Sequence, residues 1–239
     1  MKADDLITLE ATATRAWAAA EEERRGNWLL RANHGYTKRA NSAYVIGNVD
    51  TGEIPEIRDW YARRDLPLII REISLWSNPD LGAWLAGNSF RRFDETLVKT
   101  GPVSPREQTI AIVELAEWIG SYATFEGGTK GNQDHHLALI NRITTPVAPA
   151  LLQVEGEAVA CGLAVADGAW LGLFDIATSP DHRRKGHGLA LMQGLSAWGA
   201  EQGAERAYLQ VLASNAAAVS LYQRLGFSEA YRNWYWAEQ

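Results

Sequence analysis

The sequence contains one cysteine, Cys161, among 239 residues. A single thiol excludes an internal disulfide and fits a reducing compartment. Because residues 159–163 are mostly apolar, we expect Cys161 to be buried and unreactive. No apolar run approaches the roughly 20 residues that span a bilayer, and residues 1–5 lack the basic start and apolar core of a signal peptide. We therefore expect a cytoplasmic protein with no membrane partner.

An excess of basic residues is also missing. The chain has 23 Lys and Arg against 29 Asp and Glu, a formal net charge of −6. Broad binding to nucleic acid requires excess positive charge, so no nucleic-acid partner is expected. The negative charge suits a basic or amine-bearing substrate. With 46% hydrophobic and 22% charged residues, the chain can bury a core and is not a disordered tail.

The hydrophobic pattern predicts alternating helices and strands in the first part of the chain. The expected order is a helix at 5–25, strands at 27–32 and 38–46, a helix at 53–64, a strand at 66–73, a helix at 79–86 and a strand at 90–98. Residues 101–105 hold two prolines among small residues, which break both helix and sheet, and form the expected linker. We therefore expect two units, residues 1–100 and residues 101–239.

The second part continues the alternation. Expected elements are a helix at 106–125, a helix capped by Asp134 and running through 143, two hairpins within 151–178, a helix at 189–202, a strand at 206–212, a helix at 215–225 and one or two closing strands at 227–236. The hairpin turns are expected at Glu155-Gly156 and Asp167-Gly168, because such pairs favour two-residue loops.

The connection between the last hairpin strand and the following helix has the pattern Arg183-x-x-Gly186-x-Gly188. The first amide groups of a helix lack intrahelical partners and attract an anion. Glycines allow a pyrophosphate to approach the backbone, and basic residues add charge. The other interpretation is a solvated basic turn. A Walker A loop is absent, and the dinucleotide fingerprint lacks a third glycine, since Leu191 stands there.

Together with residues 208–227, this pattern resembles the GNAT (GCN5-related) N-acetyltransferase superfamily. The second segment contains a strand, Asn215, a small helix with Leu221-Tyr222, and Gly226-Phe227. The resemblance covers roughly residues 147–239 and is close to bacterial enzymes that acetylate the N-terminus of a ribosomal protein. The whole chain is similar to a bacterial GNAT group with Trp-Leu-Leu-Arg and Arg-Ala-Asn-Ser segments, here at 28–31 and 39–42.

The resemblance implies an α/β (α+β) GNAT fold, a mixed, mostly antiparallel twisted sheet flanked by helices. It implies an acyltransferase (EC 2.3.1.-) with acetyl-CoA as cosubstrate and no metal. A splay between the strand before the loop and the strand at 206–212 would admit the pantetheine. The residues implied in coenzyme A binding are Ile176, Ala177, Thr178, Arg183, Arg184, Lys185, Gly186, His187, Gly188, Leu189 and Asn215. Asn215 is alternatively a plain helix cap.

Tyr222 is the candidate general acid. It shares a helical face with Leu221 and Leu225, so its ring should point inward, and a phenol with an ordinary pKa of about 10 can protonate a leaving thiolate. The alternative is a core tyrosine. Gln210 stands where the ribosomal-protein enzymes have a glutamate, and glutamine cannot accept a proton. The candidate base is therefore Asp175, which is otherwise a structural or substrate-contacting carboxylate.

Other polar groups carry weaker signals. His135 and His136 are adjacent on an expected helix, so their rings should point apart, and no metal site is expected. Arg31, Lys38 and Arg39 are interpreted as a solvated basic stretch rather than a binding site.

Residues 27–98 repeat the element order of a GNAT core, but residues 47–53 carry acids where a phosphate loop would lie. We interpret residues 1–100 as a degenerate GNAT-like or accessory half beside the catalytic one. The leading function is acetyl transfer to a primary amine of a peptide, protein or small metabolite, by direct attack in a ternary complex. The alternatives are a coenzyme A-binding regulatory module without catalysis and an interaction domain, and a homodimer is left open.

Overall fold

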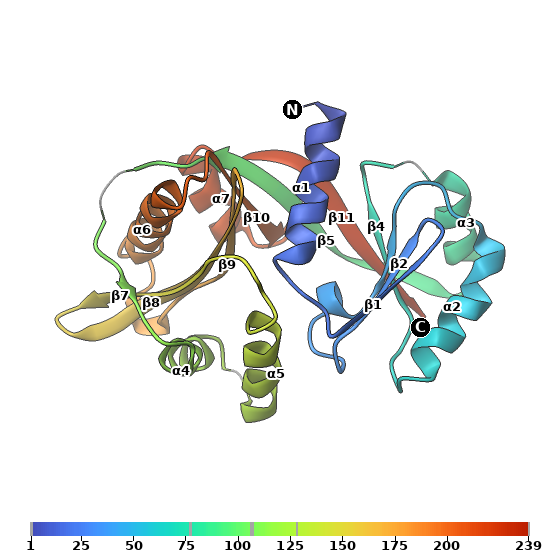
Figure 1. The fold of residues 1–239 in the computed structure, drawn as a ribbon, viewed down its shortest axis with the longest axis horizontal. Coiled ribbons are helices and arrows are strands. Elements are labelled where there is room, and N and C mark those ends of the chain that lie inside the picture. The colour runs from blue at the N-terminus through green and yellow to red at the C-terminus, as the bar shows by residue number, and fades with distance from the viewer. Residues whose placement is uncertain (1, 77, 106–107, 128, 239) are drawn as a thin grey trace.

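One sheet runs through the whole molecule. The computed structural model describes residues 2–76, 78–105, 108–127 and 129–238, and within them an 11-stranded sheet has the order β1-β2-β3-β4-β11-β5-β10-β9-β8-β7-β6 (Figure 1). Pairing is parallel between β3 and β4 and between β9 and β10, and antiparallel at the other junctions. The expected mixed, mostly antiparallel sheet is confirmed.

The elements follow one another with short connections. The first half contains α1 (Ala3–Arg15), β1 (Glu21–Arg25), β2 (Trp28–Ala32), η1 (Lys38–Ala40), β3 (Ala43–Val45), η2 (Thr51–Glu53), α2 (Ile54–Ala62), β4 (Ile69–Ile73), α3 (Pro79–Gly87) and β5 (Phe90–Pro102). The second half contains β6 (Ala111–Ile112), α4 (Leu115–Glu126), α5 (Lys130–Ile140), β7 (Val147–Val154), β8 (Glu157–Asp167), β9 (Trp170–Thr178), η3 (Pro180–His182), α6 (His187–Glu201), β10 (Arg206–Leu212), α7 (Ala216–Arg224) and β11 (Ser228–Glu238).

The two halves exchange their last strands. The strand β5 follows α3 in the chain but pairs with β10, and β11 ends the chain but pairs with β4. The two exchanged strands also pair with each other in the centre of the sheet. Strand β5 continues through Gly101 and Pro102, so the first residues of the expected linker belong to the sheet.

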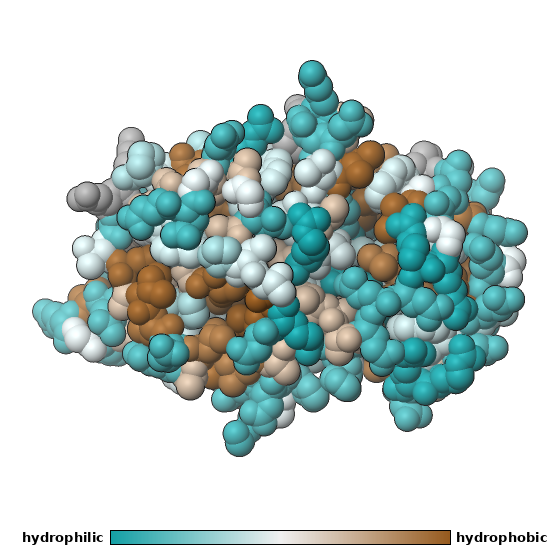
Figure 2. Space-filling view, in the orientation of Figure 1, coloured by the Kyte–Doolittle hydropathy of each residue, from teal (hydrophilic) through white to brown (hydrophobic). Residues whose placement is uncertain are grey.

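The prediction of a helix over residues 5–25 was wrong beyond Arg15, where α1 ends. Residues 21–25 form β1, which pairs with β2 through a turn in which Gly26 has φ of 52°. Glu and Arg favour helices, but the charged side chains of β1 are mostly exposed, as suits an edge strand that must avoid further pairing. Figure 2 shows the corresponding polar surface over β1 and α2 on the right of the molecule.

Further boundaries differ from the expectation. The helix expected at 106–125 begins only at Leu115, because Ala111 and Ile112 form β6 against β7; residues 106–107 lie outside the described part. The next helix begins at Lys130, where the Thr129 side chain accepts a hydrogen bond from the Asn132 N–H, so Asp134 is not its cap. Of the strand expected at 38–46, only β3 is extended, and a single strand β11 closes the chain.

Both expected hairpins are present. Glu155 and Gly156 have φ of 53° and 84°, and two successive positive values are those of a type I′ turn. In the second hairpin the two-residue loop is Gly168 and Ala169, one residue later than expected, with φ of 59° at the glycine.

Helices cover the two faces of the second half of the sheet. Alternate residues of β8 point to opposite faces. On one face Cys161 and Leu163 pack with residues of α1, α4 and α5, and on the other Ala160 and Ala164 pack with residues of α6. A third cluster lies between β2, β4 and the helices α2 and α3. As expected, Cys161 is fully buried. No helix in the described ranges is long and apolar enough to cross a bilayer.

Candidate active site

An opening forms in the sheet where β9 and β10 part. Their parallel pairing ends at Leu173 opposite Leu209, although β9 continues to Thr178 and β10 to Leu212. The strands of the C-terminal half therefore have the expected splay. Beyond Leu173 and Leu209 the two strands are not paired with each other, so backbone groups of their last residues could face a ligand between them.

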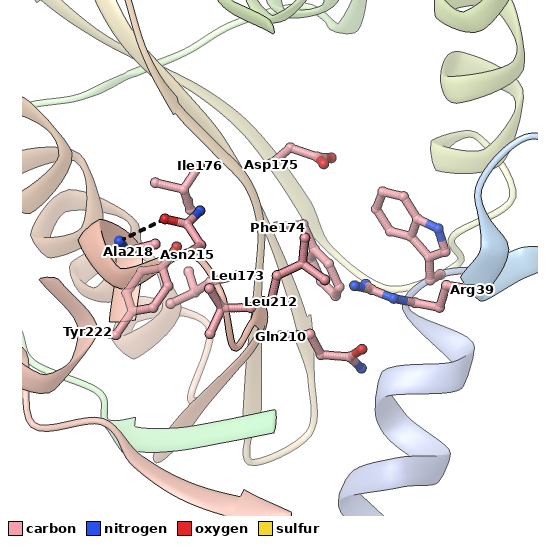
Figure 3. Close-up of a pocket in the computed structure, with 12 residues that line it drawn as sticks. Arg39, Leu173, Phe174, Asp175, Ile176, Gln210, Leu212, Asn215, Ala218 and Tyr222 are labelled. Carbon is pink, nitrogen blue, oxygen red and sulfur yellow. Dashed lines mark hydrogen bonds between the residues drawn. The ribbon is translucent and has the colours of Figure 1, made fainter. Parts of the chain in front are cut away.

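A β-bulge accompanies the splay. The register between β8 and β9 shifts between Cys161 and Leu163, so that Asp175 and Ile176 oppose the single residue Gly162. Asp175 has φ of 51°, a left-handed conformation that is uncommon outside glycine. The bulge turns the carboxylate of Asp175 toward α5, away from the direction of the neighbouring Ile176 side chain (Figure 3).

A pocket of about 250 Å³ lies at this opening. It brings together four of the candidate residues, namely Asp175, Ile176, Asn215 and Tyr222. Figure 3 shows them with the remaining lining residues, which are Trp17, Arg39, Leu173, Phe174, Gln210, Val211, Leu212 and Ala218. Two residues of the N-terminal half, Trp17 and Arg39, therefore contribute to the site.

A second pocket, of about 260 Å³, adjoins the first. The two share Trp17, Arg39, Asp175, Gln210 and Leu212, and the second extends to Thr37, Lys38, Thr96 and Tyr235. The shared residues thus lie between the first pocket, which holds Asn215 and Tyr222, and the outer part of the second pocket, which the N-terminal half mainly lines.

Tyr222 is positioned by α7 with its ring turned inward, as expected from the helical face. Its side chain is buried, and burial raises the pKa of its hydroxyl to about 12. The phenol is therefore protonated at neutral pH, the form that a general acid requires. The turn after α7 holds this position, because the Phe227 N–H donates to the Tyr222 carbonyl at 2.9 Å.

Asp175 has a partner that the sequence did not reveal. The Nε2 atom of His136, on α5, lies 3.0 Å from its Oδ2 atom. His136 is 1% exposed. Aromatic rings surround it, with centroids at 5.3–5.6 Å, from Trp17, Tyr36, Trp118 and Tyr122. Burial, together with the nearby charge of Asp175, raises the pKa of Tyr36 and of Tyr122, so both phenols remain protonated.

The pair His135-His136 was the signal that could have led to this contact. As expected, the two rings point apart: His135 is exposed and stacks near His34 and Tyr36, whereas His136 is buried. Its partner Asp175 is 39 residues away, and only the folded chain joins them. No group of three or more His, Cys, Asp or Glu side chains suited to a metal occurs in the described part of the chain.

Asn215 precedes α7 and caps it. Its Oδ1 atom accepts a hydrogen bond from the Ala218 N–H at 3.1 Å (Figure 3). Asn215 is therefore the helix cap, whatever further role it has. This capping does not compete with ligand binding, because the amide nitrogen of Asn215 can still donate.

The candidate phosphate-binding loop, residues 183–188, lies at the start of α6 and lines neither of the two pockets. Arg184 and Gly186 have φ of 63° and 89°. Gly186 is the N-cap of α6, so no side chain at this position caps the first N–H groups of the helix. The Nε atom of Arg183 donates to the Thr178 carbonyl at 3.3 Å, which ties the loop to the end of β9. A Cβ on Gly188 would lie 3.4 Å from Leu221 of α7, next to Tyr222 in the chain.

The basic residues of the first half do not form one solvated stretch. Arg31 is fully buried and donates to the carbonyls of Thr14, Trp17 and Arg39. Lys38 is partly exposed and pairs with Asp94 at 2.6 Å. The interpretation as a solvated face was wrong for Arg31, because a long-range set of acceptors surrounds it.

The bulged strand β9, its splay from β10 and the turn before α6 define a GCN5-related N-acetyltransferase fold. A structure of such a protein from Kribbella flavida has a TM-score of 0.70 with this chain, at 17% identity, and the match covers 97% of this chain and 94% of that one. The chain belongs to the family described as "Probable histone acetyltransferase Rv0428c C-terminal", whose model matches residues 4–236.

Similar proteins agree with this assignment. An "Uncharacterized N-acetyltransferase YobR" from Bacillus subtilis is 31% identical over 238 residues, which is 94% of this chain and 95% of that protein. The "[Ribosomal protein bS18]-alanine N-acetyltransferase" of Escherichia coli is 48% identical over 65 residues, 26% of this chain and 44% of that protein. The chain is thus an acetyltransferase of the GNAT family (EC 2.3.1.-), and GNAT acetyltransferases use acetyl-CoA.

Proposed function

We propose that this protein transfers the acetyl group of acetyl-CoA to a primary amine of a peptide, protein or small metabolite, by direct attack in a ternary complex. The observation that carries the proposal is the pocket at the splay of β9 and β10, where Asp175 and Tyr222 line the same space. A base and an acid on one pocket suit an amine that must lose a proton and a thiolate that must gain one.

The residues around α6 fit the cosubstrate. A Cβ on Gly186 would meet no atom within 4 Å, so open space lies beside a backbone turn at the positive end of a helix. The N–H groups of residues 184–189 would hold the pyrophosphate, with charge from Arg183, Arg184 and Lys185. The Asn215 amide would bind the pantetheine. Bound acetyl-CoA would supply an acetyl group activated as a thioester.

The end of β9 would hold the arm next to the thioester. The Ser179 N–H donates to the Val159 carbonyl on β8 at 3.0 Å. Because alternate N–H groups of a strand point to opposite sides, the N–H of Ala177 also points to β8, and that of Thr178 points into the splay. The Thr178 N–H would therefore polarise the acetyl carbonyl, with Ile176 on the same side of the strand.

Asp175 would remove the proton of the attacking ammonium, and His136 would hold the carboxylate in position. The amine nitrogen then bonds to the carbonyl carbon, the carbon–sulfur bond breaks, and Tyr222 gives its proton to the leaving sulfur. The nitrogen loses its second proton to solvent, which completes the amide, and solvent returns a proton to Tyr222. Gln210, on β10 between the two pockets, cannot act as a base and is left a role in binding. The aromatic wall of Trp17 and Phe174, whose rings stack at 5.3 Å, limits access of water.

We further propose that residues 1–100 are a degenerate GNAT half and residues 101–239 the catalytic half. In each half one parallel strand pair is joined through a helix, β3 and β4 through α2, and β9 and β10 through α6. The first half lacks the glycine loop, and the Glu53 carboxylate there accepts from the Trp28 Nε1 at 2.8 Å. A cytoplasmic location stays a prediction from the sequence, since one buried thiol suits a reducing compartment.

The test is a steady-state assay of thiol release from acetyl-CoA with a library of primary amines, with the products examined by mass spectrometry. Amine-dependent release and an acetylated product support the proposal. Binding of acetyl-CoA without turnover of any amine would favour the regulatory module, and absence of both would favour an interaction domain.

A further inference from the structure

Arg39 presents a guanidinium group without a polar partner. Within the described residues, its side chain takes part in no hydrogen bond or ion pair, and its Nε atom is buried and unsatisfied. Aromatic rings replace the missing partners: the guanidinium carbon lies 5.2 Å from the ring centre of Trp17 and 5.8 Å from that of Phe174. The side chain as a whole is only partly buried, so its remaining donors are open to an anion in the adjoining pockets.

The backbone holds Arg39 in this position. Its carbonyl accepts hydrogen bonds from Arg31 Nη1 at 2.9 Å and from the Tyr44 hydroxyl at 2.7 Å. Figure 3 shows the side chain extending from the N-terminal half toward Phe174 on β9. The position of the guanidinium is therefore set by buried contacts of the N-terminal half and by the rings at the site.

The guanidinium stands at the junction of the two pockets. Arg39 lines both, together with Asp175 and Gln210. Among the residues that the structure describes, the Oε1 atom of Gln210 also has no hydrogen-bond partner, although it is buried. The other cation of this wall, Lys38, is paired with Asp94 at 2.6 Å. Within the described part of the chain, the site thus combines Arg39, a cation without an ion-pair partner, with the carboxylate of Asp175.

We propose that the acceptor amine carries a carboxylate a few bonds from its nitrogen, as an amino acid does. Arg39 binds this carboxylate through its fork of donors, and Asp175 attracts the ammonium group. The inference rests on the proposed acetyl transfer and names its acceptor class. It differs from acetylation of a peptide N-terminus or a lysine side chain, where no carboxylate need lie close to the amine.

The experiment compares matched acceptors that differ only in this charge. Each L-amino acid and 4-aminobutanoate is assayed beside its carboxamide, with kcat/KM from thiol release. Arg39→Met removes the charge while it keeps the length and apolar packing of the side chain. Arg92→Met is the control, because Arg92 also lies over a tryptophan ring, at 3.9 Å from Trp234, but is exposed and lines neither pocket.

We expect the protein to prefer at least one acid over its carboxamide by about tenfold or more, the size of one lost hydrogen-bonded charge contact. Arg39→Met should lose this preference, and Arg92→Met should keep it. A second readout is calorimetric: the N-acetylated acid should bind the protein with coenzyme A more tightly than its carboxamide does, and Arg39→Met should remove that difference.

The inference fails if the protein acetylates carboxamides as well as acids, if it acetylates only amines without a carboxylate, or if Arg39→Met lowers both rates by the same factor. In each of these outcomes acetyl transfer itself still occurs. Failure of the proposed function has a different signature, since acetyl-CoA then neither binds nor supports turnover of any amine.

Discussion

The Nε2 atom of His136 lies 3.0 Å from the Oδ2 atom of Asp175. This contact joins α5 to the bulge of β9, and it directs the carboxylate that lines both pockets. The histidine ring is enclosed by aromatic residues, so it has little freedom to turn away. The relationship gives the site a carboxylate in a fixed orientation.

If Asp175 is the base, Asp175→Asn should lower kcat by about a hundredfold, in the range of general-base catalysis, and leave the affinity for acetyl-CoA nearly unchanged. His136→Gln should lower kcat less, because the carboxylate remains but is held loosely. Steady-state kinetics and calorimetry measure the two effects. His135→Gln, on the same helix but exposed, is the matched control. Full activity of Asp175→Asn would exclude it as the base.

Tyr222→Phe should lower turnover by about tenfold or more without a loss of acetyl-CoA affinity, because it removes only the donated proton. Burial raises the pKa of Tyr222 to about 12. A phenol is protonated below its pKa, so kcat should not fall between about pH 8 and pH 10, where an ordinary phenol begins to ionise. A profile of kcat against pH checks this point. Loss of acetyl-CoA binding in the variant, or an unchanged rate, would contradict the assignment.

Arg31 should be required for stability. It is fully buried, and it donates to three backbone carbonyls and to the Tyr44 hydroxyl. Arg31→Met would remove all of these buried hydrogen bonds, which should lower the free energy of unfolding by about 3–5 kcal/mol. Urea denaturation measures the change. Arg24→Met, at an exposed position of β1, should stay within about 0.5 kcal/mol. Equal values for the two variants would refute the role of Arg31.

Local signals predicted the C-terminal half well. Strand β10 matches residues 206–212, because its apolar residues lie between clear breaks. Tyr222 was placed on the inner side of α7 by helical spacing alone. The turn at Glu155-Gly156 followed from the preference of glycine for positive φ.

The remainder depends on contacts that are distant in the sequence. The exchange of β5 and β11 has no local signature, because the residue pattern of a strand does not show which strand it pairs with. Trp17 and Arg39 were assigned to no site, because only the pairing of the two halves brings them to Phe174. His136 was given no role in the site, because its partner Asp175 is 39 residues away in the sequence. The part of the site that the N-terminal half contributes, with Trp17 and Arg39, could therefore not be predicted from the sequence.

The most direct test of the central claim is a calorimetric titration with acetyl-CoA. The wild-type protein should bind it with a dissociation constant on the order of micromolar. The variant Arg184→Glu/Gly186→Glu should not bind, because two carboxylates would then face the pyrophosphate. The control Arg63→Glu, an exposed charge reversal at the end of α2, should bind as the wild type does. Absence of binding by the wild type, or equal binding by the loop variant, would contradict the account.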